Sequence, residues 1–186
     1  ADESWHCSKV LRKKPGDRVQ VIDGAGNFYE GVLELVSEKE SVVNITGGPL
    51  RKAARDYYLH LAIAPTKQID RIEWMIEKAV EIGIDEISFI LCKNSERTVV
   101  KTDRIIKIVE SAVKQSLQAA IPKVNEMIPL KTLLSKNADQ KLIAHCFESS
   151  KQNIKTLSFK QQSTLVLVGP EGDFTPEERS IMTQSG

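Results

Sequence analysis

Four residues, Gly169-Pro170-Glu171-Gly172, stand between an apolar segment and a strongly marked helix start, where they could hold a ligand. The apolar, β-branched run 165–168 predicts a central strand. Downstream, Thr175 is a good N-cap, Pro176 suits a first helical turn, and Glu178 is placed to close a capping box. The four residues are therefore expected at the carboxyl end of a parallel strand, where open α/β sheets bind their ligands.

The composition of this loop limits the kind of ligand. It has neither the Gly-Lys-Ser/Thr ending of a phosphate loop nor the three spaced glycines of a dinucleotide fingerprint. Glu171 and Asp173 would repel a phosphate, so a neutral or cationic ligand fits better. Gly169 and Gly172 allow a ligand close to the backbone, and Pro170 stiffens the loop. A tight strand-to-helix turn without a ligand is the alternative.

Histidine and basic residues provide the other candidate contacts. His145 follows an apolar run near the end of another predicted strand, which makes it either a wall of the ligand pocket or a core histidine. His6, Arg12 and Lys13 precede a Gly-Asp turn, where they would contact phosphate groups or form a solvated loop. Residues 93–114 are also basic. Most of those charges suit an exposed helix face, whereas Arg97, just past a predicted strand, is the strongest candidate there for a phosphate contact.

The elements that must position these residues change in character along the chain. Residues 17–48 alternate between apolar and polar in short runs with turn signals, which predicts a small antiparallel β-barrel. Strands and amphipathic helices alternate afterwards, which predicts an α/β domain with a covered parallel sheet. Helices are expected over 67–83 and over about 102–119, while Trp5 and Trp74 are expected to pack rather than stack on bases.

The composition is that of an ordinary soluble globular protein. Of 186 residues, 41% are hydrophobic and 27% are charged, with a formal net charge of +1. No apolar run reaches the roughly 18 residues of a membrane span, and no signal peptide pattern is present. The three cysteines, Cys7, Cys92 and Cys146, are scattered, which argues against a zinc site or a disulfide framework. We expect a cytoplasmic protein without a metal or a membrane partner.

Five stretches, in order, resemble the RsmE-type ribosomal small-subunit (16S) RNA uridine-N3 methyltransferases of the SPOUT (α/β-knot) superfamily. The most specific is "LVGPEGDFTPEE", which resembles the signature GPEGG-F-[ST]-x-x-E. The resemblance covers nearly the whole chain. The other four stretches are "HCSKVLRKKPGD", "KQIDRIEWMIEKAVEIGIDEI", "NSERT" and "AVKQSLQAAIP".

This resemblance implies a PUA-like β-barrel that helps to hold RNA, over residues 1–55, and a SPOUT methyltransferase domain over residues 56–186. It implies S-adenosylmethionine as the cofactor, small-subunit ribosomal RNA or the assembled subunit as the partner, and a homodimer. The implied cofactor-binding residues are His145, Gly169, Pro170, Glu171 and Gly172. The implied RNA-binding residues are His6, Arg12, Lys13, Arg97, Lys114 and Gln115.

Three departures from the family pattern stand out. Gln118 replaces an arginine, and Asp173 replaces the last glycine of GPEGG. The sequence stops at Gly186, before the L-G-x-x-I-L-R-x-E-T-A stretch that closes the knot in this family. A chain that truly lacked this stretch is expected to have an incomplete knot and weak cofactor binding.

The chemistry and the target stay open at this stage. Methylation at N3 of uracil requires removal of the imide proton, and the sequence does not identify the base. Glu171 is one possibility, although a role in loop structure suits it better. Two alternatives to the expected activity are an RNA-binding module without catalysis and another SPOUT methyltransferase that acts on transfer RNA.

Overall fold

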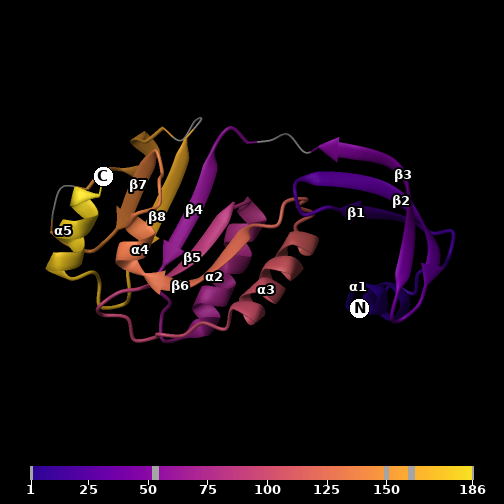
Figure 1. Ribbon diagram of the computed structural model, residues 1–186, viewed down its shortest axis with the longest axis horizontal. Coiled ribbons are helices and arrows are strands. Elements are labelled where there is room, and N and C mark those ends of the chain that lie inside the picture. Colours follow the sequence, from indigo (N-terminus) through magenta and orange to yellow (C-terminus); the bar gives the residue numbers. More distant parts are fainter. Residues whose placement is uncertain (1, 52–54, 149–150, 159–161, 186) are drawn as a thin grey trace. The chain divides into compact units, whose positions relative to one another are not determined.

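The computed structural model describes residues 2–51, 55–148, 151–158 and 162–185 (Figure 1). The chain divides into two compact units, Ala1–Ala54 and Arg55–Gly186. The first unit contains an antiparallel sheet and the second a parallel one, which confirms the predicted mixed α/β fold class. Among the described residues, no helix is both long and apolar enough to cross a bilayer.

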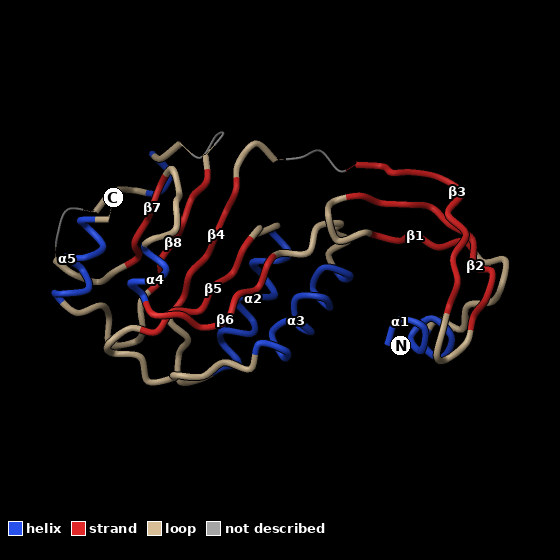
Figure 2. Tube along the Cα trace, viewed as in Figure 1, coloured by secondary structure: helices blue, strands red, loops and turns tan. Residues whose placement is uncertain are grey.

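The first unit is a three-stranded antiparallel sheet preceded by short helical turns, drawn in red and blue in Figure 2. The strands lie in the order β1-β2-β3. Asp23 shapes the turn between β1 and β2, because its Oδ1 accepts the backbone N–H groups of Ala25 (2.8 Å) and Asn27 (3.1 Å). The elements are α1 (Asp2–Trp5), η1 (His6–Val10), β1 (Arg18–Ile22), β2 (Asn27–Val36) and β3 (Ser41–Arg51).

The second unit is built on a five-stranded parallel sheet in the order β6-β5-β4-β8-β7. Its strands are β4 (Tyr58–Ile63), β5 (Glu86–Leu91), β6 (Lys123–Pro129), β7 (Gln140–Ala144) and β8 (Ser163–Val168). Its helices are α2 (Ile69–Ile82), α3 (Thr102–Gln115), α4 (Leu130–Leu134), η2 (Ile154–Thr156) and α5 (Pro176–Gln184).

The last strand in sequence, β8, is an internal strand that lies between the central strand β4 and the edge strand β7. From β4, the chain first builds outward through β5 to β6, and it later returns to the other side of β4. Such a reversal of strand order leaves a crevice outside the carboxyl ends of the strands. Val168 pairs with both Ile63 of β4 and Ala144 of β7, so these three strands end at the same level. The loop after β8 therefore lies directly beside the residues that follow β7.

Helices cover both faces of the parallel sheet. Ile72 and Ile76 of α2 and Ile105 and Val109 of α3 are buried, and the two helices pack side by side (Figure 1). The opposite face holds a separate apolar cluster to which α4 and α5 contribute. That cluster comprises Ala62, Ala64, Ile90, Cys92, Leu130, Leu133, Leu134, Leu165, Leu167, Phe174 and Met182.

Several predicted boundaries need correction. The second long helix ends at Gln115 rather than near residue 119, because Ser116 caps it and Leu117 adopts a left-handed φ of 53°. The edge strand β6 was not predicted, since its charged residues and its final Pro129 resemble a loop. The expectation that Trp5 and Trp74 pack is wrong, because their side chains are 50% and 64% exposed.

Candidate functional site

The loop after β8 is compact and internally packed. Pro170 is buried, and its carbonyl accepts the backbone N–H of Asp173 at 2.9 Å. A Cβ on Gly169 would lie 2.9 Å from the ring of Phe174, which is only 2% exposed. A Cβ on Gly172 would lie 3.2 Å from the Cβ of Asn94. A side chain at position 169 would therefore displace Phe174, while one at position 172 would need a small shift of Asn94. These packing constraints add to the ligand contact that the sequence predicts for both glycines.

The start of α5 carries the predicted capping box. Thr175 Oγ1 accepts the backbone N–H of Glu178 at 3.2 Å, and Glu178 Oε2 accepts the backbone N–H of Thr175 at 2.9 Å. The second carboxylate oxygen of Glu178 has another partner: Oε1 accepts the backbone N–H of Lys93, in the loop after β5, at 2.7 Å. One side chain therefore caps the helix and fixes a neighbouring loop.

Asn94 provides a second tie between these loops. Its Nδ2 donates to the carbonyl of Gly172 at 3.1 Å and to that of Asp173 at 3.0 Å. Ser95 holds the start of the same loop, since its Oγ accepts the backbone N–H of Cys92 at 3.0 Å. The segments after β5 and β8 are consequently cross-linked on the carboxyl side of the sheet.

His145 lies where the sequence predicts it, one residue past the end of β7 and beside the loop after β8. Its ring is half-buried, and its centroid is 5.2 Å from that of Phe147. His145 Nδ1 is buried without a hydrogen-bond partner in the described part of the protein. A buried, unused ring nitrogen beside Gly169 is a polar group that a ligand atom could satisfy. The structure thus brings together all five predicted cofactor-binding residues.

Cys92, at the end of β5, is the buried thiol near this loop system. Burial, together with the nearby charge of Glu178, raises the pKa of the Cys92 thiol to about 12. The thiol is therefore neutral at physiological pH, and Cys92 serves as an apolar residue of the core rather than as a nucleophile. In the described part of the chain, no cluster of three or more His, Cys, Asp or Glu side chains could hold a metal ion.

The predicted RNA-binding residues fall into two groups. His6, Arg12 and Lys13 belong to the first unit: His6 and Arg12 are exposed, and Lys13 is half-buried. Arg12 has a left-handed φ of 51°. In the second unit, Lys114 and Gln115 lie at the exposed end of α3. Arg97 precedes the start of that 14-residue helix, so about 20 Å of helix separates it from them.

Arg97 also has a structural task that the sequence does not reveal. Its Nε donates to the carbonyl of Thr66 at 3.1 Å, and Nη2 donates to the carbonyl of Lys67 at 2.6 Å. These bonds join the loop after β5 to the loop after β4. The guanidinium is half-buried and orients two backbone segments at the carboxyl edge of the sheet.

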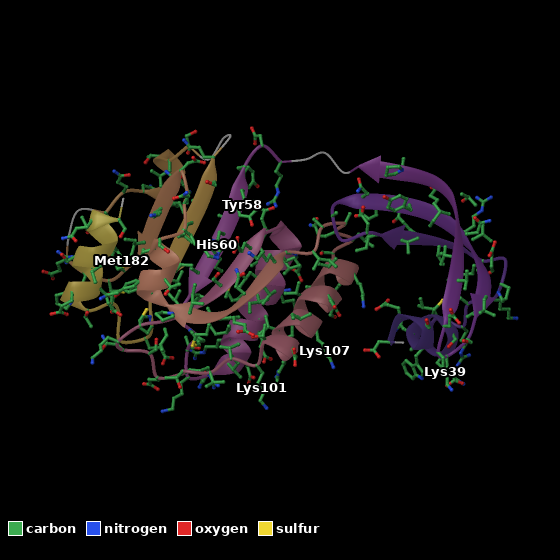
Figure 3. All side chains as sticks on the ribbon, viewed as in Figure 1. Lys39, Tyr58, His60, Lys101, Lys107 and Met182 are labelled. Atoms are coloured by element: carbon green, nitrogen blue, oxygen red, sulfur yellow. The ribbon has the colours of Figure 1, made fainter. Side chains whose placement is uncertain are left out.

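A polar cluster lies at the amino ends of β4 and β5, away from the loop after β8. Figure 3 shows Tyr58 and His60 of this cluster on β4. Glu86 accepts hydrogen bonds from Tyr58 Oη (2.9 Å), Asn125 Nδ2 (2.6 Å) and Lys136 Nζ (3.0 Å). Burial opposes the ionisation of Glu86, but these bonds outweigh it and lower the pKa of the carboxyl to about 2.

His60 lies within this cluster and is only 6% exposed. Its Nε2 is 2.8 Å from Ser88 Oγ and 3.7 Å from Glu86 Oε1. Burial lowers the pKa of His60 to about 4, although the charge of Glu86 acts in the opposite direction. The imidazole is therefore neutral at pH 7. It lies at the opposite end of β4 from the candidate site, so the cluster supports the sheet rather than the chemistry.

Sequence reasoning missed Asn94, Phe174 and the second role of Glu178. The hydrogen bonds of Asn94 and of Glu178 Oε1 join positions 78 to 85 residues apart, whereas the contact of Phe174 with Gly169 is local but depends on how the loop folds. An asparagine after a predicted strand end was a usable signal, because carboxyl-end loops of parallel strands gather at one edge of the sheet.

Comparison with protein families identifies the fold. Residues 54–186 match an RNA methyltransferase domain, and residues 1–46 match an RNA methyltransferase PUA domain. The chain belongs to the RNA methyltransferase family. Its resemblance to the RsmE-type members is also confirmed, because a relative from Rickettsia conorii is a ribosomal RNA small subunit methyltransferase E. That relative is 26% identical over 98% of this chain and 75% of its own length.

Solved structures agree with this family membership. A probable rRNA methyltransferase from Porphyromonas gingivalis is 39% identical and superposes with a TM-score of 0.90, over 100% of this chain and 79% of its own. A ribosomal RNA small subunit methyltransferase E from Neisseria gonorrhoeae, bound to S-adenosylmethionine, shares the fold at 24% identity. Its TM-score is 0.83, over 100% of this chain and 78% of its own.

Proposed function

We propose that this RNA methyltransferase transfers a methyl group from S-adenosylmethionine to N3 of a specific uridine in small-subunit (16S) ribosomal RNA. The observation that carries the proposal is the loop Gly169–Gly172, which lies beside His145 at the carboxyl edge of the sheet, where β8 enters between β4 and β7. Relatives named small subunit methyltransferase E support the RNA class.

The residues at this edge fit the proposed cofactor. The polar atoms of S-adenosylmethionine would be held by two kinds of group. One is the backbone of the loop Gly169–Gly172, and the other is Nδ1 of His145, which has no hydrogen-bond partner among the described residues. Bound there, S-adenosylmethionine would supply an electrophilic methyl carbon activated by the adjoining sulfonium. The protein's own contribution is to hold uracil N3 in line with that carbon, which removes much of the entropic barrier to transfer. The acidic residues of the loop favour a cationic ligand.

Proton removal from N3 requires a base near the target. Glu171 is exposed at the tip of the loop, and its carboxylate takes part in no hydrogen bond or ion pair among the described residues. Its neighbour Asp173, by contrast, has both carboxylate oxygens engaged. We therefore propose Glu171 as the candidate base, since it is the loop carboxylate that can turn toward a substrate.

RNA binding is assigned to basic residues of both units. We propose that the first unit, with His6, Arg12 and Lys13, is an RNA-holding PUA-like barrel and that the second, with Arg97, is the catalytic domain. Lys114 and Gln115 extend the proposed RNA contacts along α3, on which Lys107 also lies and which Lys101 precedes as the N-cap residue (Figure 3). Contacts to phosphates would position the RNA without reading its sequence.

We also propose that the protein acts in the cytoplasm as a homodimer. A groove of about 490 Å³ in the second unit is lined mostly by apolar side chains of β4, α2 and β8, with Arg55 and Tyr57 also in its wall. Ile82 in its wall is 80% exposed. A second copy of the chain would cover this apolar surface. Sedimentation equilibrium that gives a monomer at micromolar concentration would contradict the dimer.

Methyl transfer to separated RNA classes tests the proposed activity. The protein is incubated with S-adenosylmethionine labelled in its methyl group and with either unmethylated small ribosomal subunits or bulk transfer RNA. We expect label in the small-subunit RNA and none in the transfer RNA. Label in transfer RNA alone would favour a SPOUT enzyme with a different target. Absence of label from every RNA would favour a binding module without catalysis.

A further inference from the structure

Asp173 adopts a backbone conformation that side chains usually avoid. Its φ is +59°, in the left-handed region, which glycine enters freely and other residues enter at a cost. The signature that this loop resembles has glycine at the same position. Aspartate tolerates this region better than most residues when its carboxylate finds local partners. Because this conformation costs free energy in a residue other than glycine, we expect the side chain of Asp173 to make contacts that offset the cost.

The carboxylate of Asp173 makes two such contacts. Oδ1 accepts the backbone N–H of the next residue, Phe174, at 2.8 Å. Oδ2 accepts the backbone N–H of Cys146, 27 positions earlier in the chain, at 2.8 Å. The first bond stabilises the loop locally. The second joins the loop to the segment that follows β7, which a local turn does not need.

Among the described residues, the backbone of the segment after β7 makes few other hydrogen bonds. Beyond Ala144, the strand pairing with β8 ends, so the ladder no longer holds residues 145–147. Among the side chains, Phe147 packs against the apolar core cluster, its ring lies 5.2 Å from that of His145, and the guanidinium of Arg179 lies 5.0 Å from the centroid of the Phe147 ring. The Cys146–Asp173 bond is the backbone tie that fixes this segment against the loop. Asp173 therefore controls the separation between His145 and Gly169–Gly172.

Asp173 also links the loop after β5 to the loop after β8 and the segment after β7. Its carbonyl accepts a hydrogen bond from Asn94 at 3.0 Å, while its carboxylate holds Cys146. The loops after β5, β7 and β8 thus meet at one residue. A single residue that bonds to both neighbouring loops sets their relative positions more directly than any pairwise contact between them.

We infer that Asp173 is a positioning residue that holds the segment 145–147 against the loop 169–172 and thereby sets the affinity for the cofactor. The inference rests on the proposed function in one respect, the identity of the cofactor as S-adenosylmethionine. The mechanical part, in which Asp173 restrains the Cys146 amide, is independent of any ligand. Two separate readouts can therefore test the two parts.

Three substitutions separate backbone strain from the side-chain bonds. Asp173→Ala removes both bonds and keeps the strained conformation. Asp173→Gly removes both bonds but relieves the strain, so this variant is expected to fold at least as well as Asp173→Ala. Asp173→Asn keeps the shape but has one acceptor oxygen for two N–H donors, and it should be intermediate.

Asp139 offers a matched control on the same pair of strands. Its Oδ2 accepts the backbone N–H of Ser163 at 2.7 Å and the Ser163 hydroxyl at 2.8 Å. These bonds tie β7 to β8 at their amino ends, whereas Asp173 acts at their carboxyl ends. Asp139→Asn therefore perturbs the same strand pair without touching the candidate site.

Hydrogen exchange of the Cys146 amide, followed by NMR without ligand, tests the restraint. We expect exchange about tenfold faster in Asp173→Ala and Asp173→Gly, because a charge-assisted bond is lost. Calorimetric titration with S-adenosylmethionine should show a Kd about tenfold higher in both variants and intermediate in Asp173→Asn. Asp139→Asn should leave both quantities within about twofold of the unsubstituted protein.

The outcomes are distinguishable. Unchanged Cys146 exchange in Asp173→Gly would overturn the restraint. Faster exchange with an unchanged Kd would overturn the link to cofactor affinity. An unsubstituted protein that does not bind S-adenosylmethionine would refute the proposed function, while the exchange rates would still decide whether Asp173 restrains the segment.

Discussion

The carboxylate of Glu178 connects the start of α5 to the backbone of Lys93, 85 positions earlier in the chain, through a hydrogen bond of 2.7 Å. Its other oxygen closes the capping box with Thr175. Helix capping is usually a local matter of stability. Here the same side chain also fixes the loop after β5, which carries Asn94, against the loop that holds the candidate ligand site.

Removal of this carboxylate should affect both stability and binding. We expect Glu178→Ala to lower the free energy of unfolding by about 1–2 kcal/mol, because a cap and a long-range hydrogen bond are lost together. Cofactor affinity should fall in parallel, because the loop after β5 is released. Urea unfolding and calorimetric titration measure the two effects.

Glu177→Ala is the matched control for this substitution. Glu177 also lies in the first turn of α5, so both variants remove one carboxylate from the positive end of the helix dipole. Only Glu178 reaches Lys93. Equal effects of the two substitutions on stability and on cofactor affinity would contradict the cross-loop role.

The amino-end polar cluster predicts a specific dependence of stability on pH. The pKa of His60 is about 4 in the folded protein, below the ordinary histidine value of 6.5. As pH falls from 6.5 toward 4, the unfolded chain binds a proton that the folded protein does not, so stability decreases. The full contribution is present above pH 6.5 and is about 3 kcal/mol at most. The carboxyl of Glu86, with a pKa of about 2, loses its contribution to stability only at lower pH, below the ordinary glutamate pKa of 4.5.

Substitution of His60 isolates this effect. We expect His60→Gln to be less stable than the unsubstituted protein at pH 7.5, because packing against Ser88 changes. Its stability should nevertheless decrease less between pH 6.5 and pH 4.5. Urea unfolding at intervals of half a pH unit measures both slopes. Identical slopes over that window would mean that another group is responsible for the loss of stability.

Local signals explain which parts of the fold were predictable. The apolar spacing of Ile72, Ile76 and Val80 predicts α2, and Gly83 ends it with a φ of 94°, as a C-terminal glycine cap should. Thr175 and Glu178 predict the start of α5, because together they form a capping box at the N-terminus of the helix. The strand β6 was missed because an edge strand buries only part of its side chains and carries no clear apolar period.

Two substitutions of Arg97 should separate its structural role in stability from its electrostatic role in RNA binding. Arg97→Lys keeps the charge but cannot reproduce the paired bonds to Thr66 and Lys67, so we expect a loss of about 1–2 kcal/mol in stability. Its RNA binding should keep the salt dependence of the unsubstituted protein. Arg97→Ala should lower the slope of log K against log salt by about one, if one phosphate contact is lost.

Filter binding at several salt concentrations, together with thermal unfolding, measures these quantities. A salt slope for Arg97→Ala that equals the slope of the unsubstituted protein would remove Arg97 from the RNA-contacting residues. Its role would then be confined to the two loops that it joins.

Glu171 is predicted to affect the rate of methyl transfer more than cofactor affinity. An amide cannot accept the imide proton, so we expect Glu171→Gln to lower kcat about 100-fold. The Kd for S-adenosylmethionine should change less than about threefold, because the exposed carboxylate makes no contact within the loop. Glu177→Gln is the control, because it removes an exposed carboxylate on the following helix. Unchanged kcat in Glu171→Gln would exclude it as the base.

The candidate site was predictable in place but not in detail. The position of Gly169 after a buried strand and of His145 after another indicates the correct edge of the sheet. The roles of Asn94 and Asp173 depend on loops that meet only after the chain has folded. In the sequence Asp173 is visible only as a replacement of the last glycine of GPEGG, because neither its left-handed φ nor its bond to Cys146 leaves a sequence signal.

Primer extension on small-subunit RNA tests the central claim most directly. Unmethylated small subunits are incubated with the protein and S-adenosylmethionine, and the extracted RNA is then reverse transcribed. N3 methylation blocks Watson–Crick pairing of the modified uracil, so reverse transcriptase should stop beside it. We predict one strong stop at a single uridine, dependent on both protein and cofactor. If S-adenosylmethionine with a labelled methyl group transfers its label to this RNA but no such stop appears, the methyl group is on another atom. That result would contradict uridine-N3 specificity.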